Sequence, residues 1–229
     1  MRLFPGLCKK VTAVIIPARN EAARIASVLR AVVGANLPDE IIVVSDGSVD
    51  STADIARRFD GVKVVELKRN VGKGGAMAAG VGATGAEVIA FVDADLEGLK
   101  AEHVDEIIRP ILEGSADMCI GVFRSGRFWS TSAQKVAPYI SGQRALRREL
   151  FEQIPYIGDM RMGVEVAINT YAKRTRARVS RVALRGVSNT HKERKLGLIR
   201  GTAARARMWA EIGRAVVRMR RRRPRTWLK

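Results

Sequence analysis

Two aspartates at the end of an apolar run are the residues of this sequence best suited to bind a metal ion. Asp93 and Asp95 follow the apolar stretch at residues 88–92 and are separated by one residue. Residues two apart on an extended chain point to the same side, so these carboxylates are expected to lie close together. Neighbouring carboxylates repel each other unless a cation lies beside them. The pattern favours Mg²⁺ or Mn²⁺ holding a phosphate, although a bare Asp-x-Asp is also typical of a solvated strand end.

Three other polar loops follow apolar runs, and their residues have the chemistry to contact a nucleotide. Residues 17–21, 45–52 and 68–75 follow the first, second and third runs. Asp46, when ionised, only accepts hydrogen bonds, which suits the N–H of a pyrimidine or guanine base; it would equally stabilise its own turn. Lys73 lies among glycines that let backbone approach a phosphate, although the same string is typical of a flexible loop.

The runs that precede these four loops have the length and composition of strands buried on both faces of a parallel sheet. They are the apolar, β-branched stretches at residues 11–16, 41–44, 62–65 and 88–92. Helical spacing between them, a further helix at 101–112 and a strand at 118–123 predict a layered α/β fold. Because ligands bind beyond the carboxyl ends of such strands, we expect all four loops to share one cleft.

The second half of the chain offers candidates for an acceptor side. Residues 141–148 are predicted to begin a helix whose first turn presents the backbone of Gly142 and the side chain of Arg144 to an anion. The alternative is an amphipathic helix with solvated arginines. Asp159 and Glu165 precede an apolar helical stretch and are the candidate catalytic acids.

The positive charge is concentrated near the C-terminal end. Residues 173–229 contain 20 Lys and Arg and two Glu, and therefore carry the whole net charge of +18. Residues 198–219 have a helical pattern with one apolar stripe and arginines on the other faces, which suits the surface of an anionic membrane. The alternative is that the stripe packs on the body of the protein. We predict a body at residues 1–197, followed by a basic amphipathic helix and tail at 198–229.

Targeting and cysteine patterns predict a cytoplasmic protein. The first residues do not resemble a signal peptide, and no apolar run reaches the roughly 20 residues needed to span a bilayer. Cys8 and Cys119 form no metal-spaced pair and indicate thiols in a reducing compartment. With the basic tail, this predicts peripheral attachment to the inner face of the cell membrane. The oligomeric state stays open, a dimer included.

The four loops resemble, in order and spacing, the motifs of family 2 glycosyltransferases of the GT-A fold. The matching strings are Pro17-x-x-Asn-Glu21, Asp46-Gly-Ser-x-Asp-Ser-Thr52, Asn70-x-Gly-Lys-Gly74 and Asp93-Ala-Asp-Leu96. The resemblance implies a Rossmann-like, mainly parallel central sheet flanked by helices, with a nucleotide-binding half at 1–97 and an acceptor half at 98–197. It also implies an inverting hexosyltransferase that uses a UDP- or GDP-sugar and needs Mg²⁺ or Mn²⁺.

The same resemblance implies roles for single residues, which divide into a nucleotide set and a metal set. The nucleotide set is Pro17, Arg19 and Glu21 along the nucleoside pocket, Asp46 at the base, Lys73 at the base or ribose, and Asp93 at the ribose. The metal set is Asp95, holding the ion on the diphosphate, and His191 from a late loop. A lone histidine is more often structural, and His103, in a polar helical pattern, is predicted to be solvated.

Residues 158–165 resemble the acceptor-side segment of polyprenyl-phosphate sugar transferases and glucosyl-3-phosphoglycerate synthases, without the Glu-Asp pair of members that glycosylate sugars. A sugar hydroxyl needs a base to attack, whereas a phosphate with a second pKa of about 6 is already largely dianionic. We therefore expect a phosphorylated acceptor, polyprenyl phosphate first and a soluble phospho-acid such as 3-phosphoglycerate as the alternative. A nucleic-acid-binding protein would also explain the basic tail, but it leaves the four loops unexplained.

Overall fold

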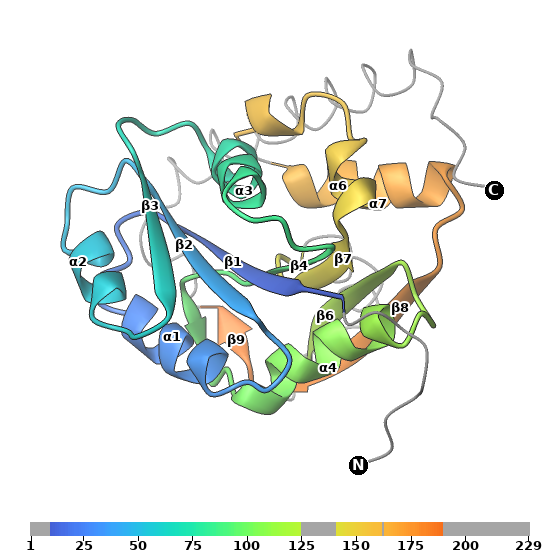
Figure 1. Cartoon of the computed structure of the whole chain (residues 1–229), viewed down its shortest axis with the longest axis horizontal. Coiled ribbons are helices and arrows are strands. Elements are labelled where there is room, and N and C mark those ends of the chain that lie inside the picture. The colour runs from blue at the N-terminus through green and yellow to red at the C-terminus, as the bar shows by residue number, and fades with distance from the viewer. Residues whose placement is uncertain (1–9, 125–140, 162, 190–229) are drawn as a thin grey trace, which may run out of the picture.

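Seven strands form the central sheet in the spatial order β3-β2-β1-β4-β7-β6-β8 (Figure 1). The structure is a computed structural model that describes residues 10–124, 141–161 and 163–189. Within these residues, β7 runs antiparallel to both of its neighbours, and the other pairs of adjacent strands are parallel. The strands of the sheet are β1 (Thr12–Ala18), β2 (Glu40–Asp46), β3 (Val62–Leu67), β4 (Val88–Phe91), β6 (Met118–Arg124), β7 (Arg144–Arg147) and β8 (Val179–Arg185).

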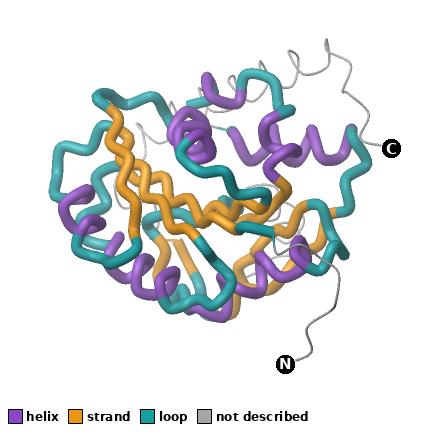
Figure 2. Tube along the Cα trace, viewed as in Figure 1, coloured by secondary structure: helices purple, strands orange, loops and turns teal. Residues whose placement is uncertain are grey.

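Helices cover both faces of the sheet, so that the molecule has three layers (Figures 1 and 2). One face carries α1 (Ile25–Val33), α2 (Thr52–Arg57) and α4 (Ala101–Leu112). The other face carries α3 (Lys73–Gly82), α6 (Arg148–Glu152) and α7 (Val164–Arg174), with the short 3-10 helix η1 (Ile157–Asp159) against α3. This arrangement is the GT-A, Rossmann-like fold that the resemblance implied.

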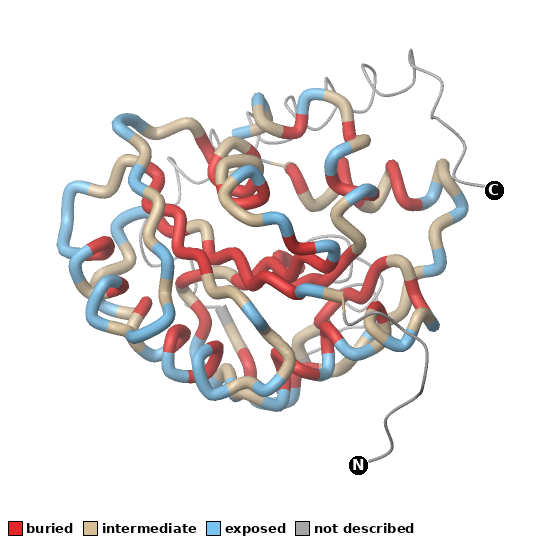
Figure 3. The backbone as a smooth tube through the Cα atoms, in the orientation of Figure 1, coloured by how far each residue is buried: buried red, intermediate tan, exposed pale blue. Residues whose placement is uncertain are grey.

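The parallel strands β1, β2 and β4 are buried on both faces, as their apolar sequences predicted, whereas β3, at the edge of the sheet, is only partly buried. In β1, Ala13 and Ile15 join the core beneath α3 and α7, whereas Val14 and Ile16 join the core beneath α1 and α4. All four side chains are fully buried, and the sheet is the most continuously buried part of the tube in Figure 3. Full burial of a Val or Ile side chain stabilises a fold by roughly 1.5–3 kcal/mol. The two cores therefore fix the sheet, and the sheet fixes the loops at its carboxyl edge.

One predicted element is wrong. The helix expected over residues 141–148 is a loop followed by strand β7, and helix α6 begins only at Arg148. Ala145 and Leu146 explain the difference, because they pack into the cores on opposite faces of the sheet. Pairing with β4 on one side and β6 on the other supplies backbone hydrogen bonds that a local helical pattern cannot reveal.

His103 is also not the solvated residue that its polar neighbourhood predicted. Its side chain is buried, and Nδ1 accepts a hydrogen bond from the backbone N–H of Lys100 at 3.2 Å. This contact closes the first turn of α4, where helical N–H groups lack intrahelical partners. The predicted boundaries of that helix, residues 101–112, are confirmed.

The basic helix and tail predicted at residues 198–229 lie outside the described residues, so the proposed division of the chain stays a prediction. Among the described helices, none is both long and apolar enough to cross a bilayer.

The loops at the carboxyl edge are joined to one another by hydrogen bonds. The N–H of Asn20 donates to Ser48 Oγ at 3.2 Å, and the N–H of Glu21 donates to Thr52 Oγ1 at 2.8 Å. Strand β5 (Leu96–Glu97), which follows the Asp-x-Asp segment, pairs with β9 (Ser188–Asn189). The edge is therefore a connected surface, as expected for a ligand-binding edge of an open parallel sheet.

Candidate active site

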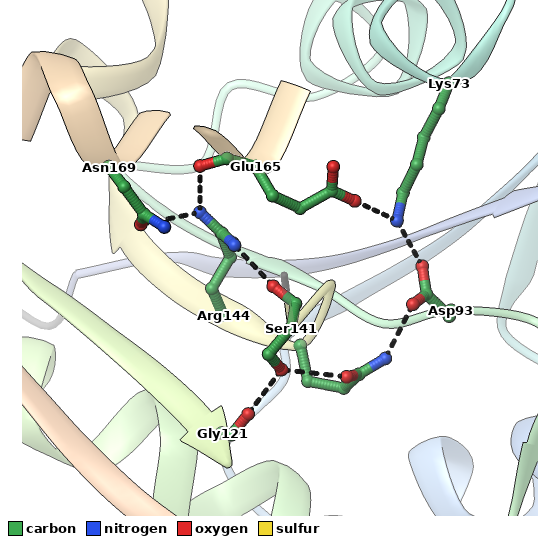
Figure 4. A network of polar contacts seen from close by, with 8 residues as sticks. Lys73, Asp93, Gly121, Ser141, Arg144, Glu165 and Asn169 are labelled. Carbon is green, nitrogen blue, oxygen red and sulfur yellow. Dashed lines mark hydrogen bonds and ion pairs between the residues drawn. The ribbon is translucent and has the colours of Figure 1, made fainter. Parts of the chain in front are cut away.

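Lys73 connects the predicted nucleotide-binding half of the chain to α7. It is the first residue of α3, and its Nζ donates to Asp93 Oδ1 and to Glu165 Oε1, both at 2.6 Å (Figure 4). Because both oxygens contact the same nitrogen, they lie within about 5 Å of each other. The strand-end aspartate and the acid of α7, predicted separately, therefore belong to one site.

The charges in this site determine its protonation. Burial favours a lower pKa for Lys73, but the carboxylates of Asp93 and Glu165 outweigh it and hold the pKa above its ordinary value. Burial acts to raise the pKa of Glu165, and the ammonium of Lys73, aided by Arg144, outweighs that effect and leaves the pKa lowered. Lys73 is thus cationic and Glu165 anionic at neutral pH.

The second oxygen of Asp93 is held by the loop before β7. Gln143 is fully buried, and its Nε2 donates to Asp93 Oδ2 at 2.9 Å. Ser141 orients this amide, because Ser141 Oγ lies 3.1 Å from Gln143 Oε1 and also contacts the carbonyl oxygen of Gly121. Gly142 permits the close approach, since a Cβ there would lie 2.2 Å from Asp93 Oδ2. Asp93 is therefore fixed from two sides.

Arg144 does not face solvent, contrary to what an anion-binding helix terminus required. It is the first residue of β7 and is fully buried. Its Nη1 donates to the carbonyl oxygen of Glu165 at 3.3 Å and to Asn169 Oδ1 at 3.2 Å, and its Nη2 donates to the carbonyl oxygen of Ser141 (Figure 4). An acceptor contact by Arg144 stays a prediction, and its burial does not favour it.

Asp46 holds the loop that carries Lys73. Its two carboxylate oxygens accept the N–H groups of Val71 at 2.7 Å and Gly72 at 3.0 Å. Gly72 has a φ of +91°, and a Cβ there would lie 2.5 Å from the Cα of Arg161, so this turn requires glycine. The contact of Asp46 with a base stays a prediction, and the structure adds that Asp46 fixes the entry to α3.

The remaining nucleotide residues line the first loop. Pro17 is partly buried near the end of β1, and Arg19 beyond it is exposed. Glu21 accepts two hydrogen bonds from Arg24, at 2.8 and 2.6 Å. Their side chains lie on the connected carboxyl edge, and their contacts with a nucleoside stay predictions.

Of the predicted metal ligands, Asp95 is partly buried just beyond β4, and His191 lies outside the described residues. Across residues 10–124, 141–161 and 163–189, no cluster of three or more acidic, histidine or cysteine side chains has metal-site geometry. An ion there would have at most two acidic, histidine or cysteine side chains of these segments as ligands. Such a donor set fits Mg²⁺ or Mn²⁺, which take few carboxylates and complete their shell with water and substrate phosphates.

The two candidate catalytic acids have different surroundings. Glu165 contacts Lys73 inside the site, with its side chain 15% exposed. Asp159 is exposed at the end of η1. The structure therefore brings Glu165, and not Asp159, into the network around Asp93.

Sequence reasoning missed three residues of this network: Ser141, Gln143 and Asn169. Each is a polar residue that contacts a charged side chain of the site or orients a residue that does. A local signal existed only for the first two, which share a short segment with the predicted Gly142 and Arg144. Asn169 lies in an ordinary helical pattern, and nothing in its neighbourhood marks it.

A family model described as glycosyl transferase family 2 matches residues 13–170, which include every residue of this network. The chain belongs to this family. The resemblance seen in the four loop motifs is thereby confirmed for the family, and the matched region spans both the nucleotide side and the Glu165 side of the site.

Known relatives of this family 2 chain fall into two groups. The 4,4'-diaponeurosporenoate glycosyltransferase of Staphylococcus aureus is 38% identical over 104 residues, which is 43% of this chain and 28% of that protein. The chain thus spans less than a third of the length of the curated relatives that it matches.

The second group consists of solved structures. Glucosyl-3-phosphoglycerate synthase from Mycobacterium tuberculosis, in complex with Mn²⁺, UDP-glucose and phosphoglyceric acid, is similar with a TM-score of 0.69 and 25% identity, covering 81% of this chain and 74% of that chain. Another crystal of that enzyme gives a TM-score of 0.73 at 23% identity, covering 93% and 85%. These similarities confirm the GT-A fold.

Proposed function

We propose that this protein is a metal-dependent glycosyltransferase that moves a hexose from a nucleotide-sugar to a phosphorylated acceptor, with inversion at the anomeric carbon. The observation that carries the proposal is the contact of Lys73 with both Asp93 and Glu165. It brings an acid of the acceptor half within about 5 Å of the strand-end aspartate of the nucleotide half. A donor and an acceptor bound on the two sides would meet there.

The residues of the chain would act chiefly by binding and orientation. The loops after β1, β2 and β3 are suited to a nucleoside, and Asp95 with His191 would hold the divalent ion. When bound, such an ion stabilises the negative charge of the departing diphosphate. Lys73, a partly buried cation beside the strand end, would add to that stabilisation, and preorganised charges of this kind are usually the largest contribution to catalysis.

The acceptor is argued from charge. A phosphate acceptor attacks as its dianion and needs cations more than a base. In this site Glu165 holds Lys73 in place, and Lys73 and Arg144 balance the two carboxylates. Glu165 would then be an orienting residue; if a base is used after all, Glu165 is the better placed of the two acids.

Two acceptors remain, and a different observation favours each. The similar M. tuberculosis structures contain phosphoglyceric acid, which favours a soluble phospho-acid. The +18 charge carried by residues 173–229 favours polyprenyl phosphate at an anionic membrane, with peripheral attachment on the inner face. We place polyprenyl phosphate first, because a small soluble phospho-acid does not require a basic segment of this size.

Transfer assays test the proposal. The full chain is incubated with Mn²⁺, a panel of UDP- and GDP-sugars, and either polyprenyl phosphate in vesicles or 3-phosphoglycerate. We expect a product with one donor, loss of product when the metal is chelated, and thermal stabilisation by that donor only with metal present. If product formed with 3-phosphoglycerate and not with polyprenyl phosphate, the acceptor would be the soluble phospho-acid and not the lipid. No product and no metal-dependent stabilisation with any donor would refute the function.

Neutralising the two acids separates orientation from base catalysis. We expect Glu165→Gln to lower kcat about tenfold, because the amide holds Lys73 less well, and Asp159→Asn to change it less than about threefold. Turnover with the acceptor identified above is the measurement, with donor KM recorded in parallel. A loss on the order of 10³-fold in Glu165→Gln with unchanged donor KM would indicate a base, and hence a hydroxyl acceptor.

A further inference from the structure

We propose that Arg144 is a positioning residue for sugar transfer: its guanidinium fixes the first turn of α7, which carries Glu165, against the loop at residues 141–143. This role rests on the proposed function, because it concerns the geometry of that reaction. It differs from the anion contact that the sequence suggested for Arg144.

The contacts of the guanidinium define the role. Nη2 donates to the carbonyl oxygen of Ser141, and Nη1 donates to the carbonyl oxygen of Glu165 at 3.3 Å and to Asn169 Oδ1 at 3.2 Å. Arg144 thereby joins a loop to the first two turns of a helix more than 20 residues further along the chain. The planar fork of an arginine makes such divergent bonds with little freedom to reorient.

Each end of this connection carries a group that faces the reaction site. On the loop side, Gln143 donates to Asp93 Oδ2 at 2.9 Å. On the helix side, Glu165 accepts from Lys73 at 2.6 Å, and Lys73 also contacts Asp93. Arg144 therefore closes a ring of contacts around Asp93 by way of the loop at residues 141–143 and Glu165 (Figure 4).

The burial of Arg144 argues against a purely structural role. Its side chain is fully buried, and its Nε has no hydrogen-bond partner in the described part of the chain. A buried cation with an unpaired donor costs folding free energy that an apolar side chain of similar size would avoid. The cost is explained if the charge and the fork are needed to set the distance between α7 and the loop.

The test compares lysine substitutions at two arginines that both donate hydrogen bonds to a main-chain carbonyl oxygen. Arg144→Lys keeps the charge but loses the fork, so α7 shifts relative to the loop. We expect kcat to fall about 30-fold with donor KM within about twofold of wild type, since a misplacement of about 1 Å costs up to 100-fold. Arg148→Lys is the control, because Arg148 also donates to a main-chain carbonyl oxygen, that of Thr84, and its other partner, the carboxylate of Glu152, lies outside the ring. It should change kcat less than about threefold.

Substitutions of Asn169 provide a second test, in which a conservative variant should retain activity. Asn169→Leu removes the side-chain acceptor of Nη1 and should lower kcat about fivefold, whereas Asn169→Asp keeps an acceptor oxygen and should stay within about threefold of wild type. The effects of Arg144→Lys and Asn169→Leu should be less than additive in the double variant, because both act through one contact.

Hydrogen exchange decides the proposal even where no acceptor supports turnover. In Arg144→Lys, amides of residues 164–169 should exchange about tenfold faster, while those of β1 stay unchanged; Arg148→Lys should leave both segments at wild-type rates. Unchanged exchange in 164–169, or unchanged kcat with the fork removed, would overturn the role of Arg144. Neither result would affect the proposed function, which fails only if the wild-type protein shows no donor use.

Discussion

Substitution of Asp95 by asparagine is expected to reduce sugar transfer about a thousandfold, which corresponds to roughly 4 kcal/mol of transition-state stabilisation. Asp95 lies just beyond β4 at the carboxyl edge. With at most two acidic, histidine or cysteine side chains from the described segments to hold a divalent ion, the loss of one carboxylate removes a large part of the binding free energy of that ion. Turnover is measured with the donor and acceptor that the wild-type protein uses.

The same variant has a binding readout. Calorimetry of the full chain with UDP should show uptake of Mn²⁺ in the wild type and at least tenfold weaker uptake in Asp95→Asn. Asp60→Asn is the matched control, because Asp60 is an exposed acid in the turn before β3 and its neutralisation makes the same change in net charge. Equal Mn²⁺ uptake in the wild type and Asp95→Asn would exclude Asp95 as a ligand.

The second large effect is expected on replacing Lys73 by methionine. Two carboxylates would then face each other within about 5 Å with no cation between them. We expect kcat to fall at least 100-fold, because the cation that we propose to stabilise the departing diphosphate is lost. Stability should fall by about 2 kcal/mol, less than for a fully buried pair because Lys73 keeps some exposure. Lys63→Met, which removes an exposed lysine on β3, is the control for both measurements.

The loss of stability in Lys73→Met should depend on pH in a definite direction. In the wild type the pKa of Glu165 is lowered, so its ionised form stabilises the fold at neutral pH; this contribution begins to be lost as the pH falls below the ordinary pKa of 4.5 and is gone once the pH is below the lowered pKa of the folded protein. In Lys73→Met, burial acts without its counter-charge and the pKa of Glu165 rises. The stability difference between wild type and variant should therefore be largest at pH 7 and shrink towards about pH 4. A difference that grows on acidification would contradict the role of Lys73 as the counter-ion of Glu165.

Local sequence determined the framework of the protein. The apolar runs at 11–16, 41–44 and 88–92 became buried parallel strands, and the run at 62–65, which is interrupted by Lys63, became the partly buried parallel strand at the edge of the sheet. Since such strands deliver their following loops to one edge, the clustering of Asp46, Lys73 and Asp93 was predictable as well. The boundaries of α4 were predictable for the same reason, because its apolar spacing is a property of neighbouring residues.

Only the tertiary structure decided which side chains of the site contact one another. The prediction for residues 141–148 failed because β7 owes its form to β4 and β6, and not to its own helical pattern. Lys73 meets Glu165 across 92 residues of sequence, so no local pattern could assign it this carboxylate partner. Arg144 looked like a solvated cation and is a buried one. The physical reason is common to all three: a side chain's charge is local, but its partners depend on which distant segments the packed cores bring together.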